Sequence, residues 1–385
     1  MEVSSRKISV LVPDDHGATD IISVEDNNVV VRPHRYPEDT YPAVWYHFRV
    51  KNLFRFRLKV TVKVKDLPKS PPGFKGLMYE PFWISSLWSS DRKNWTRIPN
   101  EKQILGEDWF QIEFSLRPSE EVWIAETYPV TYQNYISFIE DMSDLETSTF
   151  KREKIKLGVT LEKRPIYALR ITNPSSHPKY TMLLISGQHA VEESGKIFTR
   201  TVTEWLSKNY NKDPAQRILD KYEIYIVPLV NPDGCYHGRM NTNAKGQNPL
   251  LDHHCIETRS ILKLIDEISP HILINAHGWG NLMGKPPHEG WYHWKIDRLY
   301  EHMKKHMYGV NSVDWGLPDD RHILKEEFKI EYYAHKNHNT QTGILEINWN
   351  SYKPSPKKKE VKPTLQNIKE RSLQYFKTAT SMLIE

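Results

Sequence analysis

The chain contains little cysteine and no long apolar run. Its 385 residues include only Cys235 and Cys255, too few for a framework of disulfides. No run of about 18 consecutive apolar residues occurs, which excludes a membrane-spanning helix. Residues 1–20 lack an apolar core flanked by basic residues, so we expect no secretory signal. These absences favour a cytoplasmic globular protein with no membrane partner.

Neither positive nor negative charge strongly predominates in the chain. Lysine and arginine total 53 against 48 acidic residues, a net charge of +5, whereas nucleic-acid binders concentrate basic residues in dense patches. We therefore expect no nucleic-acid partner. Hydrophobic residues make up 38% and charged residues 26%, which is a globular composition, and the length predicts roughly two or three domains. The sequence does not indicate the oligomeric state.

The first third of the chain has the pattern of β structure. Residues 54–64 alternate strictly between apolar even positions and polar or basic odd positions, and residues 110–116 repeat this period of two. Such alternation predicts strands with one buried face and one face in water, so we interpret the basic row as a solvated sheet face. With further short strands at 44–50 and 122–125, we expect an antiparallel β-sandwich domain over residues 1–127.

The pattern changes after about residue 128. Four short segments are apolar throughout, as buried parallel strands are: residues 181–186, 223–228, 271–276 and 343–347. Amphipathic helical patterns lie at residues 195–207, 255–268 and 364–383. The alternation of strands and helices predicts an α/β fold. We expect an α/β/α catalytic domain with a mixed, largely parallel sheet over residues 128–385.

His189 and Glu192 stand between a predicted strand and a predicted helix. Their spacing of three brings both side chains to one point on a helical turn. An imidazole and a carboxylate are two of the three protein ligands that a catalytic zinc site uses. The alternative is a surface histidine beside a glutamate that complements the helix dipole.

Two further residues strengthen the metal interpretation. His277 follows a predicted strand at its carboxyl end, where open α/β sheets place their sites, whereas His271, the rival third ligand, begins that strand at the opposite edge. Glu346 is an acid within an apolar strand, and charged side chains are rarely buried without a task or a partner. The alternative for Glu346 is an outward-facing position on its strand.

Taken in order, these motifs resemble the zinc carboxypeptidase family. They are His189-x-x-Glu192, the turn Asn231-Pro232-Asp233-Gly234 followed by Arg239, His277 after a strand, and Glu346 within a strand. Residues 45–50, 95–99 and 125–132 are similar to the N-terminal domain of the cytosolic carboxypeptidase branch. The resemblance covers nearly the whole chain, and it implies hydrolysis of peptide or peptide-like amide bonds.

The resemblance implies a role for each matching residue. His189, Glu192 and His277 would hold one Zn²⁺ per chain, and zinc lowers the pKa of a bound water towards about 7. Glu346 would be the general base, which takes a proton from that water and later gives one to the leaving amine. Arg239 would bind the substrate and stabilise the oxyanion of the tetrahedral intermediate.

Substrate recognition departs from the family's pattern. The family binds the terminal carboxylate of its substrate with an Asn-Arg pair, but residues 247–251, Gln-Asn-Pro-Leu-Leu, stand where that pair would be. Lys245 or Arg321 could supply the missing positive charge. The resemblance implies that Tyr308 caps the substrate, with Tyr332 and Tyr333 as alternatives.

This departure leaves two other functions open. One is an amidase or endopeptidase that needs no free C-terminal carboxylate and acts, for example, on cell-wall peptides, because leucine cannot replace a bidentate arginine clamp. The other is a non-catalytic peptide-binding module on a degenerate peptidase scaffold. That function would require a lost ligand or base, and the sequence retains all four.

Overall fold

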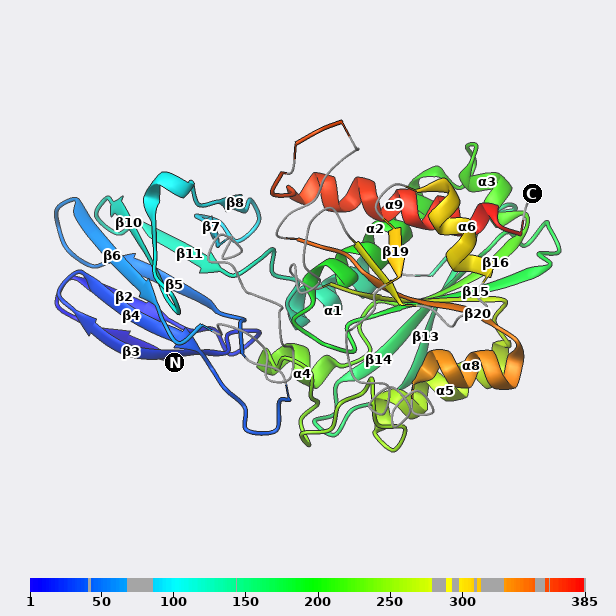
Figure 1. Cartoon of the computed structure of the whole chain (residues 1–385), viewed down its shortest axis with the longest axis horizontal. Coiled ribbons are helices and arrows are strands. Elements are labelled where there is room, and N and C mark those ends of the chain that lie inside the picture. Colours follow the sequence, from blue (N-terminus) through cyan, green and yellow to red (C-terminus); the bar gives the residue numbers. More distant parts are fainter. Residues whose placement is uncertain are drawn as a thin grey trace.

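Strands β1 to β11 form the two layers of a β-sandwich (Figure 1). The computed structural model describes residues 1–40, 43–67, 86–142, 144–278, 289–292, 298–307, 310–312, 329–349, 357–359 and 361–383. Within them, one layer has the order β1 (Glu2–Ser4), β2 (Ile8–Leu11), β5 (His47–Asn52), β11 (Glu121–Ala125), β7 (Leu87–Ser89) and β8 (Thr96–Arg97). The other has the order β3 (Thr19–Glu25), β4 (Asn28–Pro33), β6 (Leu58–Val64), β10 (Phe110–Leu116) and β9 (Gln103–Leu105), with the 3₁₀ turn η2 (Asn100–Lys102) before β9. Neighbouring strands described here are antiparallel, except for the parallel pair β4 and β6.

The alternating segments form the sandwich core, with one correction. The even positions of residues 60–64 and 110–116 are buried between the layers, as predicted. The prediction that Phe54 and Phe56 belong to the same strand is wrong, because their exposed fractions are 36% and 57%. The Asn52 side chain accepts from the Phe54 N–H (2.7 Å) and donates to the Phe56 carbonyl (2.9 Å). This local bonding competes with strand pairing and holds a turn before β6.

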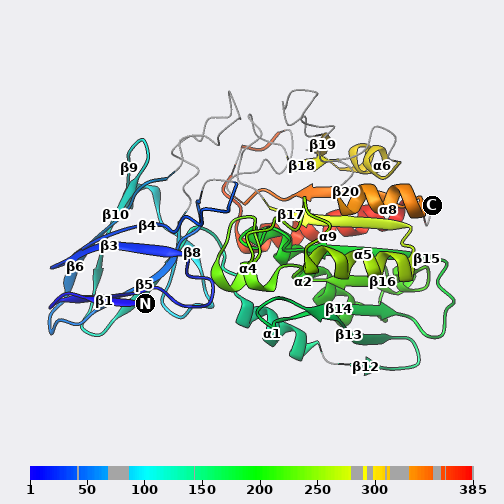
Figure 2. The same ribbon diagram turned by 90° about the horizontal axis from the view of Figure 1, so that it is seen from below.

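A mixed sheet forms the centre of the C-terminal part (Figure 2). In the described part of the chain its order is β12 (Leu145–Glu146), β13 (Lys151–Val159), β14 (Pro165–Thr172), β16 (Tyr222–Val227), β15 (Tyr180–Ser186), β17 (Ile272–His277), β20 (Gln341–Glu346), β18 (Glu289–Tyr292) and β19 (Val310–Ser312). The central strands β16, β15, β17 and β20 are parallel, and their residues are almost all buried. These are the four apolar segments that the sequence predicts.

Helices cover both faces of this sheet, which confirms the α/β/α prediction (Figure 1). One face packs against α2 (Glu193–Asn209), α3 (Ala215–Leu219), α6 (Arg298–His306) and α9 (Leu365–Ser381). The other packs against α5 (Ile256–Ile268) and α8 (Ile330–His338). The short helices α1 (Tyr132–Asp141) and α4 (Pro232–His237) share a smaller core. None of the described helices combines the length and apolar composition that crossing a bilayer requires.

The sandwich joins the C-terminal part through buried polar contacts. The Trp349 indole donates to Glu126 Oε1 (3.0 Å), and Arg97 donates to the carbonyls of Trp349 (2.6 Å) and Pro363 (2.7 Å). Burial raises the pKa of Glu126 to about 8, with a smaller contribution from Glu193, although Trp349 and Arg97 oppose the shift. The boundary at residues 127 and 128 stays a prediction.

We predict that Glu126→Gln changes how stability depends on pH. The pKa of Glu126 rises from 4.5 to about 8 on folding. Its contribution to the free energy of unfolding is therefore fully present below about pH 4.5 and is lost as the pH rises towards 8. Between pH 5 and pH 8, the free energy of unfolding of Glu126→Gln should rise relative to that of the wild type by at least about 1 kcal/mol. Urea unfolding of the metal-free protein measures this, with exposed Glu25→Gln as control. An equal difference at both pH values would contradict the assignment.

Candidate metal centre

Three side chains converge at the carboxyl edge of the parallel strands. His277 ends β17 and is the register partner of Glu346, which ends the neighbouring β20. His189 lies in the turn after β15, where Gly187 has a positive φ of 69°, a conformation that glycine adopts without strain. This edge is where the sequence predicts the site, because the ends of adjacent parallel strands meet there.

His189, Glu192 and His277 form a buried cluster. Their potential ligand atoms lie within 4.8 Å of one another. The Nδ1 of His189 is 2.8 Å from Glu192 Oε1, and the Nδ1 of His277 is 2.5 Å from Glu192 Oε2. Burial by itself would raise the pKa of Glu192, but the two histidines outweigh burial and lower it to about 2. At neutral pH the cluster therefore offers the ionised carboxylate and the two imidazoles that a catalytic zinc site uses.

The Nδ1 atoms of both histidines support the fit to a metal ion, because both face the Glu192 carboxylate. Each neutral imidazole can offer one ring nitrogen to a metal. The two-nitrogen, one-oxygen donor set suits Zn²⁺. The residues present thus fit the zinc ion that the sequence predicts.

Glu346 is a buried carboxylate beside this cluster. Its exposed fraction is 8%, and its Oε2 has no hydrogen-bond partner in the described part of the chain. Burial, and to a smaller extent the charge of Glu192, raise the pKa of Glu346 to about 8, although His277 opposes the shift. The outward-facing alternative for Glu346 is therefore wrong. A free oxygen on a side chain with a pKa near neutrality suits proton transfer.

The first turn of α2 fixes the position of Glu192. The Ser194 hydroxyl donates to the carbonyl of Ile347 (2.6 Å), directly after β20. At Gly195 an added Cβ would lie 2.2 Å from the Ala276 carbonyl oxygen, so only glycine lets the helix approach β17 this closely. The helix that follows the metal-ligand motif is thus held against both strands that carry His277 and Glu346.

His271 lies at the opposite end of β17 from the cluster. Its Nδ1 accepts from the backbone N–H of Thr181 (3.0 Å), and its ring packs against Tyr180. These contacts are at the amino ends of the parallel strands. His271 therefore cannot join His189 and Glu192 around one ion.

Arg239 contacts the sandwich, and none of its contacts in the described residues is with the cluster. Its guanidinium donates to Glu38 (3.2 Å) and to the Thr242 hydroxyl (3.3 Å), and it lies 4.1 Å from the ring centroid of Tyr36. These contacts hold the guanidinium between the loop before β5 and Thr242, and the substrate-binding role of Arg239 stays a prediction.

Asn248 is a neighbour of the cluster that sequence reasoning passed over. Its Oδ1 lies 3.3 Å from His189 Nε2, so the segment that replaces the Asn-Arg pair does reach the candidate site. In the sequence, this contact could have been inferred from the position of Asn248 in the segment that replaces the Asn-Arg pair. Lys245 is exposed on the same loop, and its backbone N–H donates to Asn243 Oδ1 (3.0 Å).

The remaining substrate-binding predictions have separate outcomes. Tyr308 and Arg321 lie outside the described residues. The Tyr333 hydroxyl donates to the Asp266 carboxylate (2.8 Å) on α5, and Tyr332 lies on α8. The Tyr333 hydroxyl is thus held by α5, and the choice of capping tyrosine stays a prediction.

The sequence analysis also did not predict a buried hydrogen-bond network of Asn275, Gln188 and Glu331. The Asn275 amide, two residues before His277 on β17, donates to Gln188 Oε1 (2.5 Å) and Glu331 Oε1 (2.6 Å). Gln188 precedes His189 and donates to the Pro249 carbonyl (3.1 Å). The network joins the turn after β15 to β17. It therefore helps to hold His189 and His277 in place.

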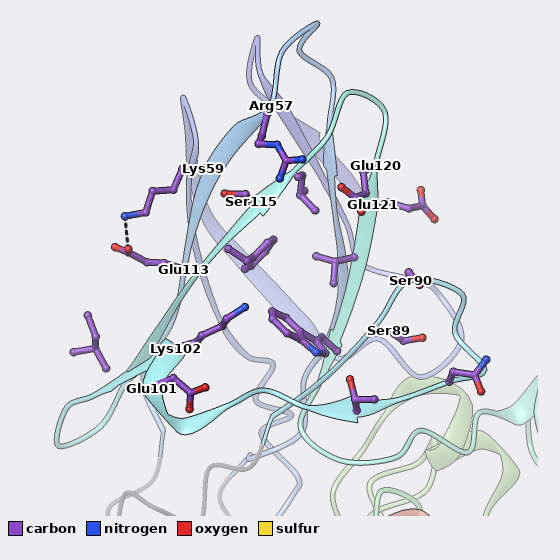
Figure 3. A pocket seen from close by; sticks show the side chains of 17 residues that line it. Arg57, Lys59, Ser89, Ser90, Glu101, Lys102, Glu113, Ser115, Glu120 and Glu121 are labelled. Carbon is purple, nitrogen blue, oxygen red and sulfur yellow. Dashed lines mark ion pairs between the residues drawn. The ribbon is translucent and has the colours of Figure 1, made fainter.

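A separate cavity of about 850 Å³ lies in the sandwich (Figure 3). Its lining residues all fall between Arg57 and Val122, so it contains no residue of the metal cluster. On its rim, Lys59 forms an ion pair with Glu113 (2.6 Å). This pairing accords with the interpretation of the basic row as a solvated sheet face.

Comparison with known proteins agrees with this architecture. Residues 136–255 match the family model described as zinc carboxypeptidase. Cytosolic carboxypeptidase 3 of Mus musculus is 24% identical over 69% of this chain, and cytosolic carboxypeptidase 6 of Homo sapiens is 22% identical over 63%. Carboxypeptidase O of Bos taurus is 35% identical over 20% of this chain. The matched regions cover 26%, 48% and 21% of these three relatives, so the chain spans less than half of each.

Two solved structures share the fold over nearly the entire chain. A metallo-carboxypeptidase from Burkholderia cenocepacia has a TM-score of 0.77 at 19% identity and covers 98% of both chains. A metallo-carboxypeptidase from Pseudomonas aeruginosa has a TM-score of 0.74 at 18% identity, covering 97% of this chain and 99% of the other. The expected fold, with a sandwich ahead of an α/β/α part, is thus confirmed.

We predict about one zinc per chain, and its loss on replacement of a cluster histidine. His277→Ala removes one of the three donors of the cluster and should reduce the zinc content to well below half, as measured by elemental analysis after gel filtration. His271→Ala is the matched control, because it changes the same strand at its other end and should keep the metal. Full zinc content in His277→Ala would contradict the assignment.

Proposed function

We propose that this chain is a member of the zinc carboxypeptidase family and a zinc-dependent hydrolase of peptide or peptide-like amide bonds. The observation that carries this proposal is the juxtaposition of the buried His189–Glu192–His277 cluster with Glu346, whose Oε2 has no hydrogen-bond partner among the described residues. A binding module would not require a base beside a metal cluster. Retention of all four groups therefore favours the enzyme over the non-catalytic alternative.

The proposed roles follow from the chemistry of each group. His189, Glu192 and His277 would hold Zn²⁺, which when bound supplies Lewis acidity towards a carbonyl and makes a water more acidic. Glu346 accepts a proton from the attacking water at its unpaired Oε2, and then gives a proton to the leaving amine. Burial of Glu346 supports this role, because it raises the pKa of the carboxyl towards the operating pH.

Two proposals concern substrate binding. Arg239 would stabilise the oxyanion with an N–H group that Glu38 and Thr242 leave free, such as its Nε, which is buried and has no hydrogen-bond partner among the described residues. Tyr308 remains proposed as the capping residue from the family resemblance. Because Leu250 and Leu251 stand where the Asn-Arg pair would be, an amidase or endopeptidase is the second candidate function.

The proposed substrate is a peptide, and the proposed location is the cytoplasm. Relatives named cytosolic carboxypeptidases match more than 60% of this chain. Both buried cysteines, Cys235 and Cys255, are free thiols, as expected in a reducing compartment.

We predict that Glu346→Gln keeps the metal but loses turnover. The amide preserves size yet cannot exchange the proton, so kcat/KM should fall by about 10²–10⁴-fold while zinc content stays unchanged. Glu126→Gln is the matched control, because Glu126 is also a buried carboxyl whose pKa is raised to about 8 but has no described contact with the cluster. Unchanged turnover in Glu346→Gln would exclude it as the base.

Peptides with free and amidated C-termini separate the two candidate functions. A carboxypeptidase forms contacts with the terminal carboxylate, so it should cleave the free peptide at least about 100-fold faster than the amide. Product analysis by mass spectrometry at matched substrate concentrations measures this ratio and shows which bond is cut. Equal rates, or cleavage within the peptide, would reject the carboxypeptidase and favour the amidase or endopeptidase.

A further inference from the structure

The carboxylate next to metal-ligand candidate Glu192 is bound by the sandwich. Glu193 Oε1 lies 2.6 Å from His16 Nε2 and 3.0 Å from Lys196 Nζ, and its Oε2 accepts from the backbone N–H of Val130 (2.7 Å). Glu193 and His16 are both 0% exposed. A side chain from the loop before β3 thus reaches the first residue of α2.

His16 is itself held in place from both parts of the chain. Its Nδ1 is 2.6 Å from the Cys235 carbonyl oxygen, and its backbone N–H donates to the Tyr236 carbonyl (2.7 Å). The Trp45 indole packs on the ring at 4.4 Å and donates to the His16 carbonyl (2.9 Å). The imidazole therefore has a fixed orientation, with its Nε2 directed at Glu193.

The backbone at His16 is strained. Its φ of 67° lies in the left-handed region, which residues other than glycine adopt at a cost. Such strain persists where surrounding contacts fix it, and it is concentrated at functional sites. The contacts of the His16 backbone with Tyr236 and Trp45 hold this conformation.

A purely structural role does not require this arrangement. Burying ionisable groups is costly, and well-packed apolar side chains stabilise a junction at least as well. The position of Glu193 gives a different reason for burying ionisable groups at this junction. Its Cα is one peptide unit from that of Glu192, and Glu192, at the N-cap of α2, makes no side-chain capping bond that would fix it locally. Fixing Glu193 therefore limits how far the Glu192 carboxylate can move from His189 and His277.

We propose that His16 is a positioning residue for the metal centre: it holds Glu193 and thereby orients Glu192 towards the ion. The inference rests on the proposed function only in requiring that the cluster binds Zn²⁺. It assigns to the sandwich a direct part in metal affinity. Partners that orient metal ligands typically contribute 10–100-fold to affinity.

Zinc affinity of His16→Leu tests the proposal. Leucine fills similar space but cannot bond Glu193, so the dissociation constant for zinc should rise by about 10-fold, measured by competition with a chromophoric chelator. His47→Leu is the matched control. His47 is also buried and packs against the same Trp45, and none of its contacts among the described residues is with Glu193. Its replacement should leave zinc affinity unchanged, even where urea unfolding of the metal-free protein shows altered stability.

Two further variants separate positioning from loss of folding. His16→Gln retains an N–H donor for Glu193, so its zinc affinity should be close to that of the wild type. This variant also tests the proposal if His16→Leu does not fold. Glu193→Gln combined with His16→Leu should weaken zinc binding no more than the stronger single change, because the two residues act in one chain of contacts.

The outcomes distinguish this inference from the proposed function. Zinc affinity in His16→Leu equal to that of His47→Leu and wild type would overturn the positioning role while leaving the metal centre intact. Additive effects in the double variant would also overturn it. A wild-type protein that binds no zinc would instead end the proposed function, and with it this inference.

Discussion

The metal centre depends on one turn of helix, the start of α2. Within four consecutive residues, Glu192 faces the two histidines, Glu193 bonds the sandwich, Ser194 bonds the chain after β20, and Gly195 packs on β17. These contacts come from the turn after β15, the sandwich, β17 and the chain after β20. Because the interior is close-packed, a shift of this turn would disturb all of them together.

Polar groups add to an apolar contact where the two parts of the chain meet. The apolar cluster contains Ala43, Trp45, Ala125, Val191 and Met240. Beside it lie the pairs His16 with Glu193, Glu126 with Trp349, and Arg239 with Glu38. Buried hydrogen-bonded groups specify one orientation, whereas an apolar surface tolerates sliding. The sandwich is therefore best understood as part of the site's support.

The sequence predicted features that depend on local pattern. The four apolar strands, the helices that cover the sheet and the convergence of His189, Glu192 and His277 follow from periodicity and from the common edge of parallel strands. Contacts between distant segments leave no such pattern. His16 and Glu193 are 177 positions apart, and Phe54 and Phe56 keep the strand alternation although Asn52 holds a turn there.

Anomalous diffraction at the zinc absorption edge tests the central claim most directly. If the account is correct, crystals of the protein purified with zinc will show one strong peak, about 2.0–2.2 Å from a nitrogen of His189, a nitrogen of His277 and an oxygen of Glu192. A peak bound elsewhere, or none at this cluster with zinc present in excess, would contradict it.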